Sequence, residues 1–79
     1  MSNFDHEELL KDLEDEIDGV HKYANMAHNA ETSVDRAFFH AMARDEHSHA
    51  KVIMRKLSAE HVEIPSDLMD KYEAIAGFH

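Results

Sequence analysis

Residues 39–57 read FHAMARDEHSHAKVIMRKL, and this stretch predicts a long amphipathic helix whose apolar face is interrupted once. Its apolar residues recur at the spacing that returns to one face of a helix. Continuing that series between Met42 and Ile53 requires positions 46 and 49. Glu46 and His49 occupy these positions one helical turn apart, so both belong to the face that packs inward. The stripe consists of Phe39, Met42, Ile53 and Leu57, with Val34, Phe38, Ala41 and Val52 beside it.

The composition describes one small acidic domain without cysteine. The 79 residues include 17 Asp and Glu against 8 Lys and Arg, which gives a formal net charge of −9. This charge disfavours nucleic acid and anionic membranes as partners and favours cations. The absence of cysteine excludes disulfides and thiolate metal sites. Since so short a chain buries a thin core, helix packing, a bound metal or self-association must supply its stability.

The sequence carries no signal for a membrane or for export. No apolar run approaches the ~18 residues that cross a bilayer, and the N-terminus is acidic, unlike a secretory signal peptide. We therefore expect a cytoplasmic protein without a membrane partner.

Periodicity and turn signals predict an all-α fold, an antiparallel two-helix hairpin followed by a short C-terminal helix. Thr32 followed by Asp35 is a helix-start signature, so the chain should turn near Glu31. One uninterrupted helix is the alternative, because no Gly or Pro lies at the turn. The expected single domain, residues 1–79, has helices at about 3–30, 33–58 and 66–77.

The ends of the first and third helices are predicted from their capping residues. The first helix should start near Ser2 or Asn3, where Ser2 and Asp5 form a capping pair. Ser66 should cap the third helix and Gly77 should end it.

A third ionisable residue, Glu16, interrupts the matching face of the first helix. When the hairpin is folded about Glu31, Glu16 and Glu46 each stand ~22 Å from the turn, and His49 lies about one turn farther. A charged group in an apolar face is costly unless it is paired or binds a metal. Glu16, Glu46 and His49 are therefore candidate metal ligands, against the alternative that the glutamates reach outward or pair with lysines. The face of the first helix comprises Leu9, Leu13, Val20, Tyr23 and Ala27, widened by Leu10, Ile17 and Ala24.

One chain supplies too few ligands for two hard cations and leaves half of its hairpin face uncovered. A two-fold homodimer would form a four-helix bundle and bring together two copies each of Glu16, Glu46 and His49. Four carboxylates and two imidazoles are the ligand complement of di-iron and di-manganese bundle proteins. The mixed donors favour iron or manganese.

The sequence resembles the ferritin-like di-iron carboxylate proteins of the short single-hairpin type, the encapsulated ferritins, and is similar to the rubrerythrin erythrin domain. The resemblance is carried by Glu16, by Tyr23 seven residues later and by the stretch Arg44-Asp45-Glu46-His47-Ser48-His49-Ala50, and it covers residues 9–57. It implies a ferroxidase with two iron ions per dimer, and dimers that assemble into a ring-like homo-oligomer. An encapsulin shell is the implied partner and compartment, but Tyr72 to His79 contains no recognisable targeting tail.

For three further residues, Tyr23, Asp15 and Asp18, the sequence allows both a functional and a purely structural interpretation. By the resemblance, Tyr23 donates a hydrogen bond to a metal ligand; otherwise it is a core aromatic residue. Asp15 and Asp18 form either a cation entrance or a solvated helix face. The predicted function is oxidation of ferrous iron, with Glu16, Glu46 and His49 as catalytic and metal-binding residues. A rubrerythrin-like peroxide-reducing protein and a metal-free helical dimerisation module are the alternatives.

Overall fold

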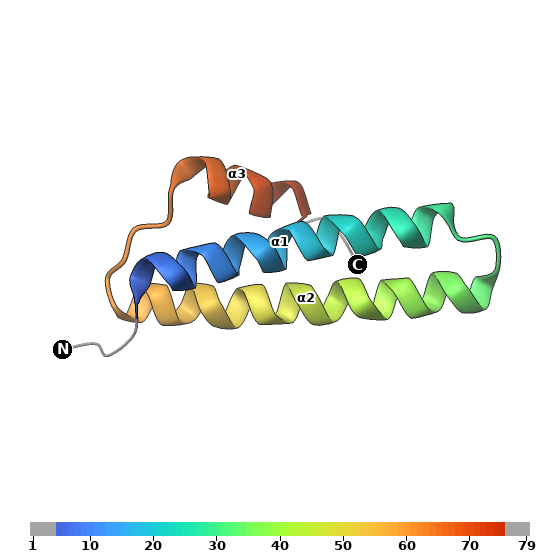
Figure 1. Ribbon diagram of the computed structural model, residues 1–79, viewed down its shortest axis with the longest axis horizontal. Coiled ribbons are helices and arrows are strands. Elements are labelled where there is room, and N and C mark those ends of the chain that lie inside the picture. Colours follow the sequence, from blue (N-terminus) through green and yellow to red (C-terminus); the bar gives the residue numbers. More distant parts are fainter. Residues whose placement is uncertain (1–4, 76–79) are drawn as a thin grey trace.

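Three helices make up the structure, a computed structural model that describes residues 5–75. Helices α1 (His6–Asn29) and α2 (Ser33–Ala59) run antiparallel along each other, and α3 (Ser66–Ile75) lies against α1 (Figure 1). The predicted all-α hairpin with a short C-terminal helix is therefore confirmed. Within residues 5–75, no helix is both long and apolar enough to cross a membrane.

The hairpin turn forms where the sequence predicts it. α1 ends at Asn29, and Thr32 is the N-cap of α2, where its Oγ1 accepts a hydrogen bond of 3.1 Å from the backbone N–H of Asp35. Across the turn, Arg36 Nη2 donates to the backbone carbonyl of Ala30 at 3.2 Å. These contacts satisfy backbone groups that both helix ends would otherwise leave unpaired. The alternative of one uninterrupted helix is wrong.

α1 begins three residues later than predicted. Asp5 has an extended backbone, and its carboxylate accepts from the backbone N–H groups of Glu7 at 2.9 Å and Glu8 at 3.3 Å. Because Asp5 caps the helix itself, the first helical residue is His6. Ser2, the predicted cap, lies outside the described residues.

The chain leaves α2 through a tight turn centred on His61, whose φ of 58° is in the left-handed region. The N–H of His61 donates to the carbonyl of Ser58 at 3.0 Å, and that of Val62 to Leu57 at 2.9 Å. This pair of bonds is the Schellman pattern of helix ends, completed by apolar packing of Val62 against the core that contains Leu57.

α3 starts differently from the prediction. The carbonyl of Pro65 accepts from Leu68 and Met69, so Ser66 is the first helical residue and not the cap. Gly77, predicted to end this helix, lies outside the described residues.

The α2 side of the core between α1 and α2 consists of two small residues and one large one. Ala43, Ala50 and Leu57 are fully buried and lie seven residues apart. Of the predicted stripe, Leu57 is buried as expected, whereas Phe39, Met42 and Ile53 are only partly buried. Small side chains let the two helices approach closely, which leaves the larger ones at the edge of the contact. The buried residues contributed by α1 are Leu13, Ile17, Val20 and Ala27.

α3 covers one side of the hairpin only. Its buried residues Leu68 and Ile75 join the core, and Lys71 forms ion pairs with Glu14 at 3.3 Å and Asp18 at 3.7 Å. Two residues turn a helix by roughly 200°, so the side of α1 that bears Glu16 is opposite to the side that bears Glu14 and Asp18. The face that carries Glu16 is therefore left uncovered by α3.

Candidate metal centre

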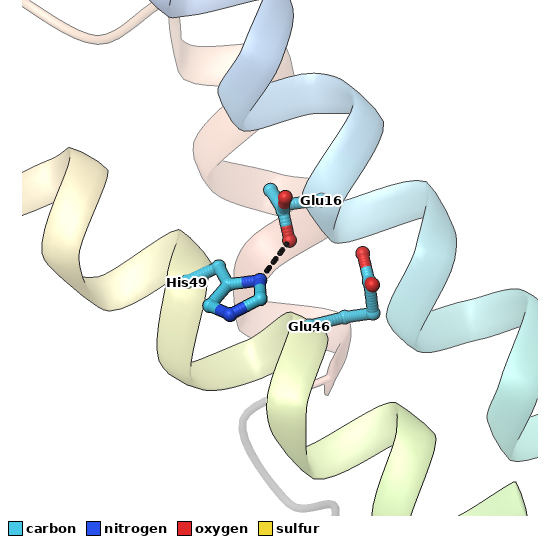
Figure 2. Close-up of side chains that lie close together, drawn as sticks. All are labelled: Glu16, Glu46 and His49. Atoms are coloured by element: carbon cyan, nitrogen blue, oxygen red, sulfur yellow. Dashed lines mark hydrogen bonds and ion pairs between the residues drawn. The ribbon is translucent and has the colours of Figure 1, made fainter.

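Glu16, Glu46 and His49 come together midway along the hairpin. One ligand atom from each lies within 4.8 Å of the others. Figure 2 shows Glu16 descending from α1 between the two side chains of α2, with a dashed contact to His49. In that contact His49 Nδ1 donates a hydrogen bond of 3.2 Å to Glu16 Oε2. The sequence predicts that Glu16 and Glu46 lie level with each other when the hairpin is folded about Glu31, and the structure brings their side chains together.

The three side chains differ in how far solvent reaches them. The side chain of Glu16 is 24% exposed and that of His49 is 60% exposed, while Glu46 is half-buried. A cation can therefore reach the cluster from the uncovered face of the hairpin. Both carboxylates also contact protein on one side: Glu16 bonds to His49, and Glu46 lies against α1.

The carboxyl group of Glu46 has negatively charged neighbours and a raised pKa. Burial raises the pKa of the Glu46 carboxyl above its ordinary value. A hydrogen bond with Glu16, the charge of Glu16 and the charge of Asp45 raise it further, while His49 acts in the opposite direction. Two carboxylates at this separation repel each other unless a proton or a cation lies between them. The cluster is thus a place where a cation relieves an unfavourable interaction.

Gly19 provides the space in which the Glu46 carboxylate lies. A Cβ built at Gly19 would stand 2.7 Å from Glu46 Oε2, below the 3.0 Å that real Cβ atoms respect. The carboxylate therefore sits against the bare backbone of α1, in a recess that any side chain at position 19 would fill.

The donor set fits a divalent metal ion. Two carboxylates and one imidazole, close together on rigid helices, match iron and manganese better than softer metals. One chain supplies only part of the complement that two ions require. The residues present therefore suit half of a di-metal site.

Tyr23 packs as an aromatic residue within the hairpin. Its ring stacks on that of Phe39, with centroids 6.4 Å apart and planes 15° from parallel, and Lys22 Nζ lies 5.4 Å from the ring centroid. Within residues 5–75 we observe no interaction between Tyr23 and Glu16, Glu46 or His49. A hydrogen bond from its hydroxyl to a metal ligand stays a prediction.

The two aspartates of the predicted cation entrance are in different surroundings. Both aspartates are exposed on α1, and Asp18 pairs with Lys71 of α3. Lys71 also pairs with Glu14, so a lysine neutralises part of this acidic surface. The entrance role of Asp15 and Asp18 stays a prediction.

Reasoning from the sequence did not find two residues that shape this region. Gly19 was marked only by its poor helix propensity inside a helical run, which was the available signal. Lys71 contacts Glu14 from 57 positions away, and neither spacing nor periodicity indicates such a contact.

A protein-family model described as Rubrerythrin matches residues 6–77 of the chain. This match confirms the similarity to the rubrerythrin domain that the residues around Glu16 and Glu46 indicate. No curated protein and no solved structure matches the chain.

Proposed function

We propose, from the premise that the chain belongs to the rubrerythrin family of ferritin-like di-iron proteins, that it oxidises ferrous to ferric iron at a site shared by two copies. The observation that carries the proposal is the cluster of Glu16, Glu46 and His49, whose ligand atoms lie within 4.8 Å of one another. Ferrous iron is the substrate, and the role of the protein is iron storage or detoxification.

The uncovered face of the hairpin supports pairing with a second copy. Met42, Glu46, His49 and Ile53 follow one another along α2 at steps of four, three and four residues. A two-fold axis passing between Glu46 and His49 would place Met42 of each copy opposite Ile53 of the other. The central positions would then hold the ligands of both copies, flanked by apolar contacts.

Exposed apolar side chains extend the same face. Phe38 is 58% and Val52 is 55% exposed, although side chains of this size are usually buried. A contiguous apolar surface around polar residues is typical of an association site. A second copy would cover these side chains and complete the ligand set, two requirements that one contact satisfies.

The residues of the site have separate roles in the proposed reaction. Glu16 and Glu46 attract ferrous ions, and their charge stabilises the ferric product more than the ferrous substrate. His49 binds as a neutral imidazole, so binding should weaken as the pH falls. Two adjacent ferrous ions each give up one electron, and dioxygen takes up both electrons and two protons to form hydrogen peroxide. Peroxide itself can be the acceptor, in which case two further protons give two water molecules.

The proposal is tested by removing single ligands. Glu46→Ala and His49→Ala should abolish most of the ferrous oxidation above the protein-free rate, measured by the absorbance of ferric iron. Glu31→Ala is the matched control, because Glu31 is an exposed glutamate at the turn. Oxidation by both site variants at the rate of the parent protein would show that the cluster is not the reaction site.

The second candidate is reduction of peroxide, which the family match supports equally. None of the 79 residues is a cysteine that could bind a rubredoxin-type iron, so the electrons for this reaction would come from a donor outside these residues. Turnover of peroxide with a reductant, without accumulation of ferric product, would favour it. A metal-free dimerisation module is the remaining alternative, and purified protein that dimerises in chelator and never contains iron or manganese would establish it.

A further inference from the structure

We infer that Gly19 is a positioning residue of this centre: its missing side chain is what allows the Glu46 carboxylate to lie beside Glu16. The inference rests on the proposed function and adds a residue that is not a ligand.

The distances around Gly19 identify Glu46 as its neighbour. The three heavy atoms nearest to a Cβ at this position all belong to Glu46: Oε2 at 2.7 Å, Cδ at 3.1 Å and Cγ at 3.2 Å. The terminal half of the Glu46 side chain therefore runs across the surface of Gly19. A Cβ would meet a whole segment of that side chain, not one atom at its edge.

The backbone gives no other reason for glycine here. Gly19 lies in the interior of α1 and does not have a positive φ. Every residue type except proline accepts such a backbone, and alanine favours it far more than glycine does. The poorest helix former after proline thus stands where the chain needs no conformational freedom but does need room for a carboxylate.

A side chain at position 19 should displace Glu46 and leave the fold intact. The crowded atoms are at the flexible end of Glu46, which can rotate toward solvent while α1 keeps its place. Glu46 would then no longer lie within 4.8 Å of Glu16 and His49. Substitution of a residue that orients a metal ligand typically lowers metal affinity about 10–100-fold.

The test measures the affinity of Gly19→Ala and of the parent protein for manganese(II) by isothermal titration calorimetry. We expect about 10–100-fold weaker binding together with unchanged helical circular dichroism. Asn25→Ala is the matched control, because Asn25 is exposed on the same helix and the substitution also improves helix propensity. The control should bind manganese as the parent does.

A second comparison separates positioning from a general structural effect. In a Glu46→Ala background no carboxylate remains to be displaced, so adding Gly19→Ala should there only improve helix propensity. The melting temperature without metal should rise more on adding Gly19→Ala to that background than to the parent protein.

The possible outcomes are distinct. Equal manganese affinity of the parent and Gly19→Ala would overturn the inference and leave the metal centre standing. An equal rise in melting temperature in both backgrounds would also overturn it, because the effect would then not act through Glu46. If the parent protein binds neither manganese nor ferrous iron, the proposed function fails and the inference fails with it.

Discussion

Replacing Glu46 by Gln should stabilise the metal-free protein while it removes metal binding. The substitution keeps the size of the side chain and deletes one of two negative charges whose oxygens lie within 4.8 Å. Unit charges at that separation repel by about 1 kcal/mol at the dielectric constant of water and by about 3.5 kcal/mol at an effective value of about 20. Glu16 is 24% exposed. Since solvent screens the pair, we expect the free energy of unfolding to rise by about 1 kcal/mol at neutral pH.

The size of this gain should depend on pH. The pKa of Glu46 is raised in the folded chain above its ordinary value of 4.5, so the folded state holds the proton more tightly than the unfolded state. The stability that this proton contributes is fully present below pH 4.5 and is lost as the pH rises through the raised folded pKa. The parent and the glutamine variant should therefore be similarly stable in acid and should differ most at neutral pH.

Urea denaturation followed by circular dichroism measures the difference, with chelator present and at equal protein concentrations, because association also affects stability. Glu31→Gln is the control, since it removes the same charge from an exposed position at the turn. A glutamine variant that is less stable than the parent at neutral pH would refute the reasoning. An equal gain from Glu31→Gln would show that overall charge, and not the contact with Glu16, is responsible.

Three further substitutions test other parts of the structure. Phe38→Glu should dissociate the proposed dimer and weaken metal binding, although residue 38 lies ~12 Å along α2 from Glu46. Sedimentation analysis with and without ferrous iron measures the association, and a variant that remains dimeric would contradict the prediction. Leu57→Ala should lower the free energy of unfolding by about 2–5 kcal/mol, because a fully buried side chain is lost, and a smaller loss in urea denaturation would mean that the core collapses around it. Thr32→Ala should cost about 1 kcal/mol by removing the acceptor for the Asp35 N–H, again measured in urea, with no change in metal affinity.

The hairpin and the meeting of the three candidate ligands could be predicted because both follow from counting along helices. A helix advances by a fixed distance per residue, so two positions equally far from a turn lie opposite each other. The turn itself was marked by Thr32 and Asp35, a local signal that the structure contains. Glu16 and Glu46 therefore needed no three-dimensional information to be placed side by side.

The residues that bury the hairpin were harder to identify. A stripe drawn through Met42 and Ile53 favours large apolar residues, but these are only partly buried in one chain. Ala43 and Ala50 lie at the contact instead, and alanine is too common on all faces of helices to mark one. Gly19 presents the same difficulty, because its role appears only once the position of the Glu46 carboxylate is known.

The connection between α2 and α3 determines how firmly α3 is held. Residues 60–65 form a short tether whose first turn is fixed by backbone hydrogen bonds of His61 and Val62. Such a tether gives a docked segment a high effective concentration, so α3 stays in place although, within residues 66–75, it contributes only Leu68 and Ile75 to the buried core. The same segment supplied as a free peptide should bind weakly. A single proteolytic cut within residues 60–65 would thus release α3 and turn the Glu14 and Asp18 side of α1 into a second open, acidic face.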